Sequence, residues 1–375
     1  MARVVVIGGG YAGLACLIDL AKKAPQLERH LVDGRSTHCK MTNLHKTFVK
    51  PVTDFTVPYA ELGDRFGFRL HQQQLGITQA AVKTWQQTKK LPLADGELAF
   101  DWLVVATGSR PQIQPMNENV FGLSALQDGR GPQLLEDWVT KAVDPRIELS
   151  FVGAGATGLQ VLFELQEQLR RKRVDCGLRL VDLGNRLAAE LPDGAHRYIG
   201  RKLQREKIDY LPDTEFLGQE DGEVLLAEKE SGRKYRLPST ATLLFPGVKP
   251  APWALQSNPY GQVEIDGQVL ADIFSAGDCA DYAGNGLNHL TAQAAVRKGK
   301  LVAQNICSIN ADRDLRPYRY QEKGYLLSLG SIDAVGWLLL RCNLITGFKA
   351  NVLKEALESQ YDLYLDGVDT YLGSP

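Results

Sequence analysis

The 375-residue chain is predicted to be an α/β protein, with two Rossmann-like dinucleotide-binding domains of three-layer ββα architecture and a small C-terminal α+β segment. Two observations predict this fold. A strand, a glycine-rich turn, a helix and a second strand follow one another from residue 3, and the same order returns from residue 147. Each copy ends on an aspartate, and a repeat of this size indicates a duplicated domain rather than a solenoid.

The first unit occupies residues 3–33. Its β-branched run over 3–7 is typical of a buried parallel strand. The turn Gly8-Gly9-Gly10-Tyr11-Ala12-Gly13 follows, and a helical pattern then ends before Pro25. A short strand over 30–32 closes the unit on Asp33, which gives the length expected of one β-α-β motif.

The second unit repeats this order in residues 147–182. A strand over 147–152 leads into the turn Gly153-Ala154-Gly155-Ala156-Thr157-Gly158, and a helical pattern starts at Leu159. The strand over 178–181 closes on Asp182.

Hairpin-like segments and a strand ending at glycine follow each unit. The first such strand, over 102–105, runs into Ala106-Thr107-Gly108, and the second, over 243–245, runs into Pro246-Gly247. Later elements are predicted as a strand and turn over 273–278, a helix over about 290–305, a strand or hairpin over 324–330 and a helix over about 349–366.

The composition excludes several classes of function. Lys and Arg total 43 against 44 Asp and Glu, so there is no whole-protein basic surface for nucleic acid. No apolar run reaches the roughly 18 residues of a membrane-spanning helix. The six cysteines lie far apart without metal-ligand or C-x-x-C spacing, so we predict no metal site, no redox dithiol and a cytoplasmic location.

The two turns have the chemistry of a pyrophosphate site. A helix N-terminus offers free N–H groups and partial positive charge, and glycines allow the backbone to approach the phosphates. Gly8 permits the tight turn, Gly10 leaves room for the pyrophosphate, and Gly13 lets the helix pack on the strand. An acidic residue at the next strand end binds ribose hydroxyls. Asp182 in that place repels a 2′-phosphate and favours NADH over NADPH.

The whole chain resembles the two-dinucleotide flavoproteins of the FAD/NAD(P) pyridine nucleotide-disulfide oxidoreductase superfamily, and most closely the type II NADH:quinone oxidoreductases. The resemblance rests on both glycine motifs, on the sequence 106–111 and on Phe274-Ser275-Ala276-Gly277-Asp278. The C-terminal sequence from Gly324, including Gly347-Phe348-Lys349-Ala350, is similar to the tail of that subgroup.

The resemblance implies that the first turn binds FAD and the second binds NADH, with NADPH left open. It implies a discontinuous FAD-binding domain (1–111 and 245–320), an NAD(P)H-binding domain (112–244) and a C-terminal interface or tail segment (321–375). The implied cofactor-binding residues are Gly8, Gly10, Tyr11, Ala12, Gly13, Asp33, Arg35, Val82, Ala106, Thr107, Gly108, Gly277, Asp278, Thr291, Ala292, Gly153, Gly155, Thr157, Gly158, Asp182 and Gly247.

The implied reaction passes a hydride from NADH to FAD N5 and then two electrons to a quinone. Three residues are expected to serve it. Gln160 stands where the subgroup commonly has a glutamate, and a packing role stays open. Lys40, or Lys46 in the same loop, is expected to stabilise the reduced flavin, with a plain surface loop as the alternative. Gln293 belongs to an Ala-Gln motif near the flavin, whereas Arg297, where a second glutamine is common, is expected on a solvated helix face.

The electron acceptor is the least defined part of this interpretation. Disulfide and sulfide branches of the superfamily need cysteines beside the flavin that this chain lacks, so a quinone or another small electron acceptor is expected. Two alternatives stay open. One is a soluble NADH-dependent reductase of a ferredoxin-like or rubredoxin-like carrier. The other is a redox-sensing flavoprotein like the apoptosis-inducing factors.

The C-terminal helix has apolar residues at helical spacing, among them Val352, Leu353, Ala356, Leu357 and Tyr361. Its charged side chains carry a net negative charge that anionic lipid repels. This pattern favours packing on the core or on a second subunit, and a homodimer or peripheral contact with the inner face of the membrane stays open.

Overall fold

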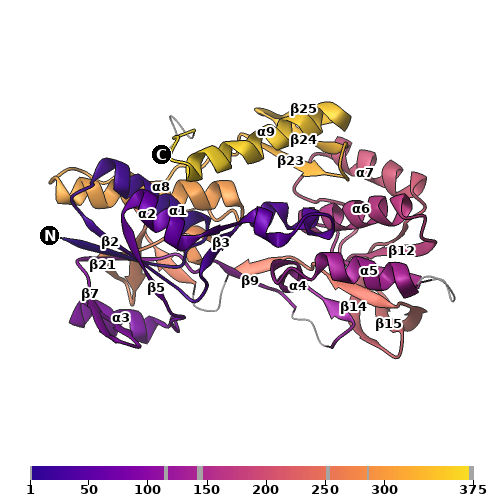
Figure 1. Ribbon diagram of the computed structural model, residues 1–375, viewed down its shortest axis with the longest axis horizontal. Helices are drawn as coiled ribbons and strands as arrows, with labels where there is room; N and C mark the ends of the chain where they lie inside the picture. Colours follow the sequence, from indigo (N-terminus) through magenta and orange to yellow (C-terminus); the bar gives the residue numbers. More distant parts are fainter. Residues whose placement is uncertain (1, 114–116, 142–146, 251–253, 285–286, 371–375) are drawn as a thin grey trace.

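The computed structural model describes residues 2–113, 117–141, 147–250, 254–284 and 287–370. Two lobes lie side by side, and the C-terminal segment extends along one side of both (Figure 1). Each lobe is built on a parallel β-sheet, which confirms the predicted α/β fold.

The first lobe contains an eight-stranded sheet in the order β22-β19-β20-β21-β8-β1-β2-β5. Strands β21, β8, β1, β2 and β5 run parallel to one another, whereas β20 pairs antiparallel with β21. The strands are β1 (Arg3–Ile7), β2 (Glu28–Asp33), β5 (Phe68–Gln72), β8 (Trp102–Val105), β19 (Leu255–Ser257), β20 (Gln262–Ile265), β21 (Gln268–Ser275) and β22 (Ala280–Tyr282).

The second lobe contains a five-stranded parallel sheet in the order β10-β17-β11-β12-β13. Its run β17-β11-β12-β13 repeats the run β8-β1-β2-β5 of the first lobe, so the predicted duplication extends to the order of the strands. The strands are β10 (Val120–Phe121), β11 (Ile147–Val152), β12 (Cys176–Val181), β13 (Asp209–Leu211) and β17 (Ala241–Leu244).

Both lobes have three layers. In the first, Val4 and Val6 pack towards helices α1 (Tyr11–Lys23) and α8 (Ala292–Asn310). Val5 and Ile7 pack on the opposite face, against α3 (Gln79–Thr88) and the hairpin β6 (Lys90–Leu93) and β7 (Gly96–Ala99). In the second, α6 (Ala156–Arg171) covers one face, and β14 (Thr214–Glu220), β15 (Glu223–Glu228) and β16 (Lys234–Pro238) cover the other.

Among the described residues, two contacts join the lobes where the glycine turns lie between them. Strand β9 (Ser109–Pro111) pairs antiparallel with β18 (Val248–Pro250), and the 3-10 helix η1 (Met41–Phe48) packs against α6. The C-terminal segment contains β23 (Gly324–Ser328), β24 (Ala334–Leu338), β25 (Leu340–Thr346) and α9 (Gly347–Leu365). The remaining elements are β3 (Thr37–Cys39), η2 (Val52–Phe55), β4 (Thr56–Pro58), α2 (Tyr59–Phe66), α4 (Leu123–Gln127), α5 (Gly131–Lys141), α7 (Asp193–Arg205) and η3 (Gly277–Cys279).

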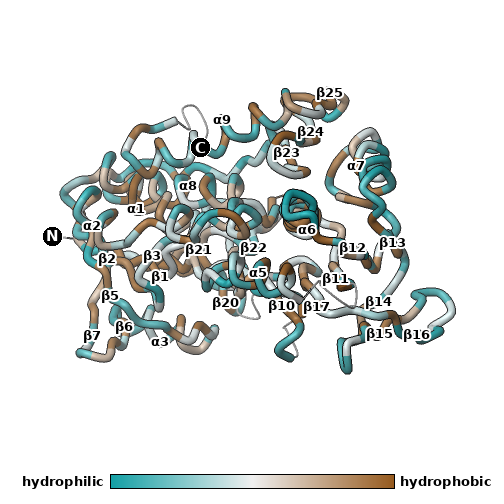
Figure 2. The backbone as a smooth tube through the Cα atoms, turned by 45° about the vertical axis from the view of Figure 1, so that its right-hand side comes forward, coloured by the Kyte–Doolittle hydropathy of each residue, from teal (hydrophilic) through white to brown (hydrophobic). Residues whose placement is uncertain are grey.

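The buried face of helix α9 is not the apolar face that its sequence predicts. Val352, Leu353 and Leu357 are exposed, whereas Asn351 and Lys354 are buried. Packing on the core, one of the two expected arrangements, is therefore wrong for the first half of the helix, and packing on a second subunit stays a prediction. Only its second half, with Tyr364 and its neighbours, joins the hydrophobic core beneath α1. The tube in Figure 2 alternates between hydrophobic and hydrophilic colours along α9.

Candidate dinucleotide sites

The first glycine turn is shaped by close backbone contacts. The Gly8 amide donates to the Val32 carbonyl oxygen at 2.8 Å, which closes the turn between β1 and β2. A Cβ on Gly8, whose φ is +103°, would lie 2.4 Å from the Ala106 carbonyl oxygen. A Cβ on Gly13 would lie 1.9 Å from the Gly8 carbonyl oxygen. Both positions therefore require glycine for packing alone.

Gly10 differs from these two because a Cβ there would meet no described atom within 4 Å. It is the N-cap of α1, and no described side chain caps this helix or places an acid in its first turn. The first N–H groups of α1, from Tyr11 and Ala12 onwards, have no acceptor within their own helix. An open space in front of an uncapped helix N-terminus fits a pyrophosphate.

The second turn has the same geometry. The Gly153 amide donates to the Val181 carbonyl oxygen at 2.8 Å, and a Cβ on Gly158 would lie 1.9 Å from the Gly153 carbonyl oxygen. Gly155, like Gly10, faces space free of described atoms and is an N-cap glycine with no described side-chain cap. Thr157 lies in the first turn of α6. Each of the two turns thus leaves open space in front of the N-terminus of its own helix.

The two aspartates bind their turns in the same way. One oxygen of Asp33 accepts from the Gly9 amide at 2.7 Å, and the other accepts from the Arg35 amide at 2.8 Å. Asp182 likewise accepts from the amides of Ala154 and Gly184. A carboxylate has about four acceptor positions, so Asp182 retains capacity for ribose hydroxyls. Asp33 is approached by two further donors at 3.4 Å, the Arg35 side chain and the Tyr59 hydroxyl, which a ribose hydroxyl would replace.

Arg186 is the first cation that follows Asp182 in the sequence. Its guanidinium forms a 2.5 Å salt bridge with Asp193 and donates to the Leu191 carbonyl oxygen at 3.0 Å. These partners hold the guanidinium, which supports the preference for a nucleotide without a 2′-phosphate.

Three side chains support the first turn although no sequence pattern predicted this role for them. Tyr59 donates its hydroxyl hydrogen to the Gly9 carbonyl oxygen at 2.8 Å, and Nδ1 of His38 lies 3.0 Å from the same oxygen. Tyr361 of α9 lies 3.0 Å from Nε2 of His38. Burial lowers the pKa of His38 to about 4, so the imidazole is neutral. Nδ1–H therefore donates to Gly9, and Nε2 accepts from Tyr361.

The Asp278 turn faces the first glycine turn. A Cβ on Gly277 would lie 3.0 Å from the Ala12 Cβ, so the two turns are in close contact. Ser109 donates to the Asp278 carboxylate at 2.7 Å, and burial raises the pKa of this carboxyl group. Gly108, like Gly10, meets no described atom at its Cβ position.

Helix α8 begins beside these turns. The Thr291 hydroxyl accepts from the Ala294 amide at 3.2 Å and caps the helix, with Ala292 as the first helical residue. The Gln293 side-chain oxygen lies 3.5 Å from the Tyr320 hydroxyl. This arrangement brings the predicted residues of α8 to the same lobe as the first turn.

Lys40 and Lys46 are not on a free surface loop. Lys40 forms a 3.0 Å salt bridge with Asp362 of α9, and Lys46 binds Glu355 at 2.8 Å and Glu358 at 2.7 Å. The plain surface-loop alternative is therefore wrong. Gln160 lies half-buried in the first turns of α6. The catalytic roles of Lys40, Gln160 and Gln293 stay predictions.

The surroundings of Arg297 and Val82 differ from those that the sequence predicted. Arg297 is 4 % exposed and donates to the Gln321 carbonyl oxygen at 2.8 Å, so its predicted solvated position is wrong. Its guanidinium stacks over the Tyr320 ring at 5.3 Å. Val82 has a buried side chain, and its amide donates to the carbonyl oxygen of Thr78, the N-cap of α3, so this amide is not free for adenine.

The remaining predicted residues line the strand ends. The Ala106 amide donates to the Ile7 carbonyl oxygen at 2.7 Å, and Thr107 follows it between β8 and β9. Gly247 has φ +92°, and its carbonyl oxygen accepts from the Gln112 amide at 3.1 Å.

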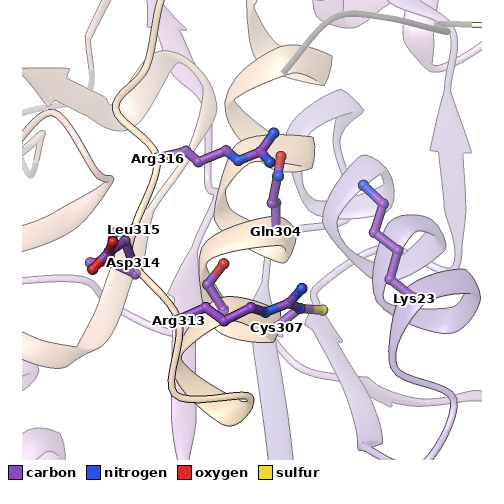
Figure 3. A pocket seen from close by; sticks show the side chains of 8 residues that line it. Lys23, Gln304, Cys307, Arg313, Asp314, Leu315 and Arg316 are labelled. Carbon is purple, nitrogen blue, oxygen red and sulfur yellow. The ribbon is translucent and has the colours of Figure 1, made fainter.

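A separate hollow of about 540 Å³ lies at the far ends of α1 and α8. Figure 3 shows Lys23, Gln304, Cys307 and Arg316 around it. Gln304 is 13 residues beyond Thr291 along the chain, which separates them by about 20 Å in a helix. This hollow is therefore not part of either dinucleotide site.

Within the described ranges, no three His, Cys, Asp or Glu side chains gather in a metal-binding arrangement. No described helix is both long enough and apolar enough to cross a bilayer.

Known proteins resemble this chain in sequence. The sequence profile of the pyridine nucleotide-disulphide oxidoreductase family matches residues 2–299. A type II NADH:quinone oxidoreductase of Staphylococcus epidermidis is 25 % identical over 398 residues, covering 98 % of this chain and 96 % of that protein.

Two solved structures share the fold at lower identity. The sulfide:quinone oxidoreductase of Aquifex aeolicus superposes with a TM-score of 0.80 at 16 % identity, covering 98 % of this chain and 92 % of that one. NDH2 of Plasmodium falciparum, solved with NADH, superposes with a TM-score of 0.77 at 12 % identity, covering 100 % and 99 %.

Proposed function

Because this chain belongs to the pyridine nucleotide-disulphide oxidoreductase family, we propose that it is an FAD-dependent NADH dehydrogenase that passes electrons to a quinone. One observation carries the proposal. Two uncapped helices start at open glycines, Gly10 and Gly155, in lobes that repeat the same strand order. Two such turns suit two dinucleotides.

We assign FAD to residues 1–111 with 245–320 and NADH to residues 112–244. The assignment of FAD is supported by the Asp278 turn, which packs on α1 of the first lobe through the contact of Gly277 with Ala12. Asp278 suits the ribityl or pyrophosphate part of FAD, and Asp33 suits its adenosine ribose. Asp182 has the corresponding role for NADH, and the partners of Arg186 favour NADH over NADPH.

A bound flavin supplies the chemistry that accepts a hydride and releases two electrons. The protein's part is positioning and electrostatics. Backbone N–H groups of α1 and α6 hold the two pyrophosphates, and the contacts of His38 and Tyr59 hold the Gly9 carbonyl oxygen that shapes the first turn. Lys40, Gln160 and Gln293 are proposed to face the reacting rings, where Lys40 provides positive charge and the two glutamines provide hydrogen bonds.

The C-terminal segment supports a quinone as the acceptor, because it offers a surface suited to a lipid phase. Several apolar side chains of this segment are exposed, on α9, at the start of β25 and at the residue before β25. They are Leu339, Leu340, Phe348, Val352, Leu353 and Leu357. Exposed apolar side chains concentrated in one segment suit an interaction site. We propose that it contacts the membrane that holds the quinone.

The acidic residues of α9 do not oppose this contact. Glu355 and Glu358 pair with Lys46, and Asp362 pairs with Lys40. Asp366 and Asp369, just beyond the helix, pair with Arg65 at 2.8 Å and Lys300 at 3.0 Å. Four cations of the first lobe, together with Lys354 of α9, which pairs with Glu358, thus offset the negative charge that would repel anionic lipid.

An anaerobic stopped-flow experiment tests the proposal. The purified holoprotein is expected to be yellow, to lose its flavin absorbance with NADH, and to recover it rapidly with a soluble quinone. Fast reduction followed by slow recovery with every quinone would contradict the quinone assignment and favour a protein carrier or a sensor. A protein that stays colourless after reconstitution with FAD would contradict the flavin assignment.

A further inference from the structure

Lys298, in the second turn of α8, has an unusual position for a lysine. Lys298 is only 1 % exposed, although lysines are almost never fully buried without a charged partner. The ammonium donates to the Ala280 carbonyl oxygen at 2.7 Å, to Oδ1 of Asn288 at 3.1 Å and to the Gly277 carbonyl oxygen at 3.4 Å. Three acceptors match the three N–H groups of a charged ammonium.

The environment of this ammonium is otherwise aromatic. The rings of Tyr282 and Tyr318 lie 4.5 Å and 5.9 Å from Nζ, and both favour a cation. The titratable groups that face Lys298 are Asp278 and Cys279 of η3, Asp281 and Tyr282 of β22, and Tyr318 of the segment before β23. Among the described residues, Lys298 forms no salt bridge with any carboxylate.

The three acceptors connect the Asp278 turn with the segment that leads into α8. Gly277 and Ala280 flank Asp278, whereas Asn288 lies three residues before the helix cap. Asn288 is itself bound to β22, because its Oδ1 accepts from the Tyr282 amide at 2.9 Å. The next residue, Gly299, touches α1, since a Cβ there would lie 2.1 Å from the Ala12 carbonyl oxygen. Lys298 thus joins the elements that surround the proposed flavin site.

We propose that Lys298 is a positioning residue for the flavin, whose charged ammonium holds the Asp278 turn and the start of α8 in the arrangement that accepts the anionic cofactor. This inference rests on the assignment of FAD to the first lobe.

The charge of Lys298 gives this role a distinct pH dependence. Burial lowers the pKa of Lys298 to about 8, so the cofactor-free protein loses this charge near that pH. The negative pyrophosphate of FAD favours the charged form. Binding of FAD above pH 8 therefore takes up a proton, and the affinity for FAD falls by up to about tenfold per pH unit.

Folding stability changes in the opposite direction. The unfolded lysine has a pKa of 10.5, so between about 8 and 10.5 the unfolded chain binds the proton that the folded chain has lost. The contribution of Lys298 to stability therefore rises with pH in that window. A purely structural role does not predict an affinity that falls while stability rises.

The test is a titration of the full-length apoprotein with FAD, followed by flavin fluorescence and calorimetry without NADH or an acceptor. For the natural chain we expect FAD affinity to fall about tenfold or more between roughly pH 7 and pH 9.5, with proton uptake on binding. Lys298→Met should bind FAD about tenfold more weakly near pH 7 and show no such pH dependence.

Lys300→Met is the matched control. Lys300 lies two residues along the same helix and is also buried, but it pairs with two carboxylates, Asp369 at 3.0 Å and Asp19 at 3.8 Å. This variant should keep the pH profile of the natural chain.

Unchanged affinity and pH dependence in Lys298→Met would overturn the inference. If that variant does not fold, the natural chain decides alone, because an affinity that stays constant across the window without proton uptake overturns it equally. A protein with the expected FAD profile whose flavin is not reduced by NADH would contradict the proposed function while leaving the role of Lys298 intact.

Discussion

Gly10 and Gly13 lie three residues apart in one turn, yet an added methyl group should affect them in opposite ways. Gly10→Ala places its Cβ where no described atom lies within 4 Å, and the φ of −72° suits any residue. The exchange of glycine for alanine at an N-cap costs about 1 kcal/mol. The variant should therefore fold.

The same methyl group occupies the space in front of α1. If the pyrophosphate lies there, Gly10→Ala displaces it from the first N–H groups of the helix. Each hydrogen bond to a charged group is worth about 1.5–3 kcal/mol, so losing two of them lowers FAD affinity about 100-fold or more.

Gly13→Ala acts on the fold instead. Its Cβ would lie 1.9 Å from the Gly8 carbonyl oxygen, a contact that only a backbone shift relieves. We expect a loss of about 3 kcal/mol in the free energy of unfolding. Gly155→Ala, the counterpart of Gly10→Ala in the second lobe, should retain FAD and weaken NADH binding by a similar factor.

Thermal unfolding of each apoprotein and titration with FAD separate these effects. The reasoning is refuted if Gly10→Ala binds FAD as tightly as the natural chain, or if Gly13→Ala unfolds at the same temperature.

Three further predictions concern other parts of the molecule. Asp182→Ser should raise the KM for NADH and reduce the discrimination against NADPH about tenfold in steady-state assays, and an unchanged preference would reject the ribose role. His38 has a pKa near 4 in the fold against 6.5 in the unfolded chain, so lowering the pH through this window should cost about 3 kcal/mol of stability. His38→Gln should lose that component of acid unfolding, and an identical acid transition would argue against it. The double variant Phe348→Ser with Leu357→Ser should keep the fold, because both side chains are exposed, but bind anionic vesicles about tenfold more weakly. Vesicle sedimentation measures this, and undiminished binding would place the membrane contact elsewhere.

Local patterns in the sequence predicted the architecture well. The strand over 3–7, the helix ending before Pro25 and the strand closing on Asp33 correspond to β1, α1 and β2. These elements follow from β-branched runs, helical periodicity and glycine turns, all of which act between residues close in the chain. Duplication of the motif then implied the second sheet.

The last helix shows where such reasoning fails. The spacing of Val352, Leu353 and Leu357 predicted a buried face, but these side chains are exposed. Lys46 of η1 instead draws Glu355 and Glu358 towards the first lobe. The periodicity of a helix shows that it has two faces, but the surface that meets it decides which one is covered.

The two glycine turns and their aspartates could be predicted from the sequence, because the motif that identifies each of them spans only about thirty residues. The Ala106 carbonyl oxygen, which excludes a side chain at Gly8, comes from a distant strand end. Only the tertiary structure revealed that His38 links the Gly9 carbonyl oxygen to Tyr361, and that three oxygens surround Lys298. Those partners come from elements far apart in the chain, and burial, which sets the charge of each group, is a property of the assembled fold.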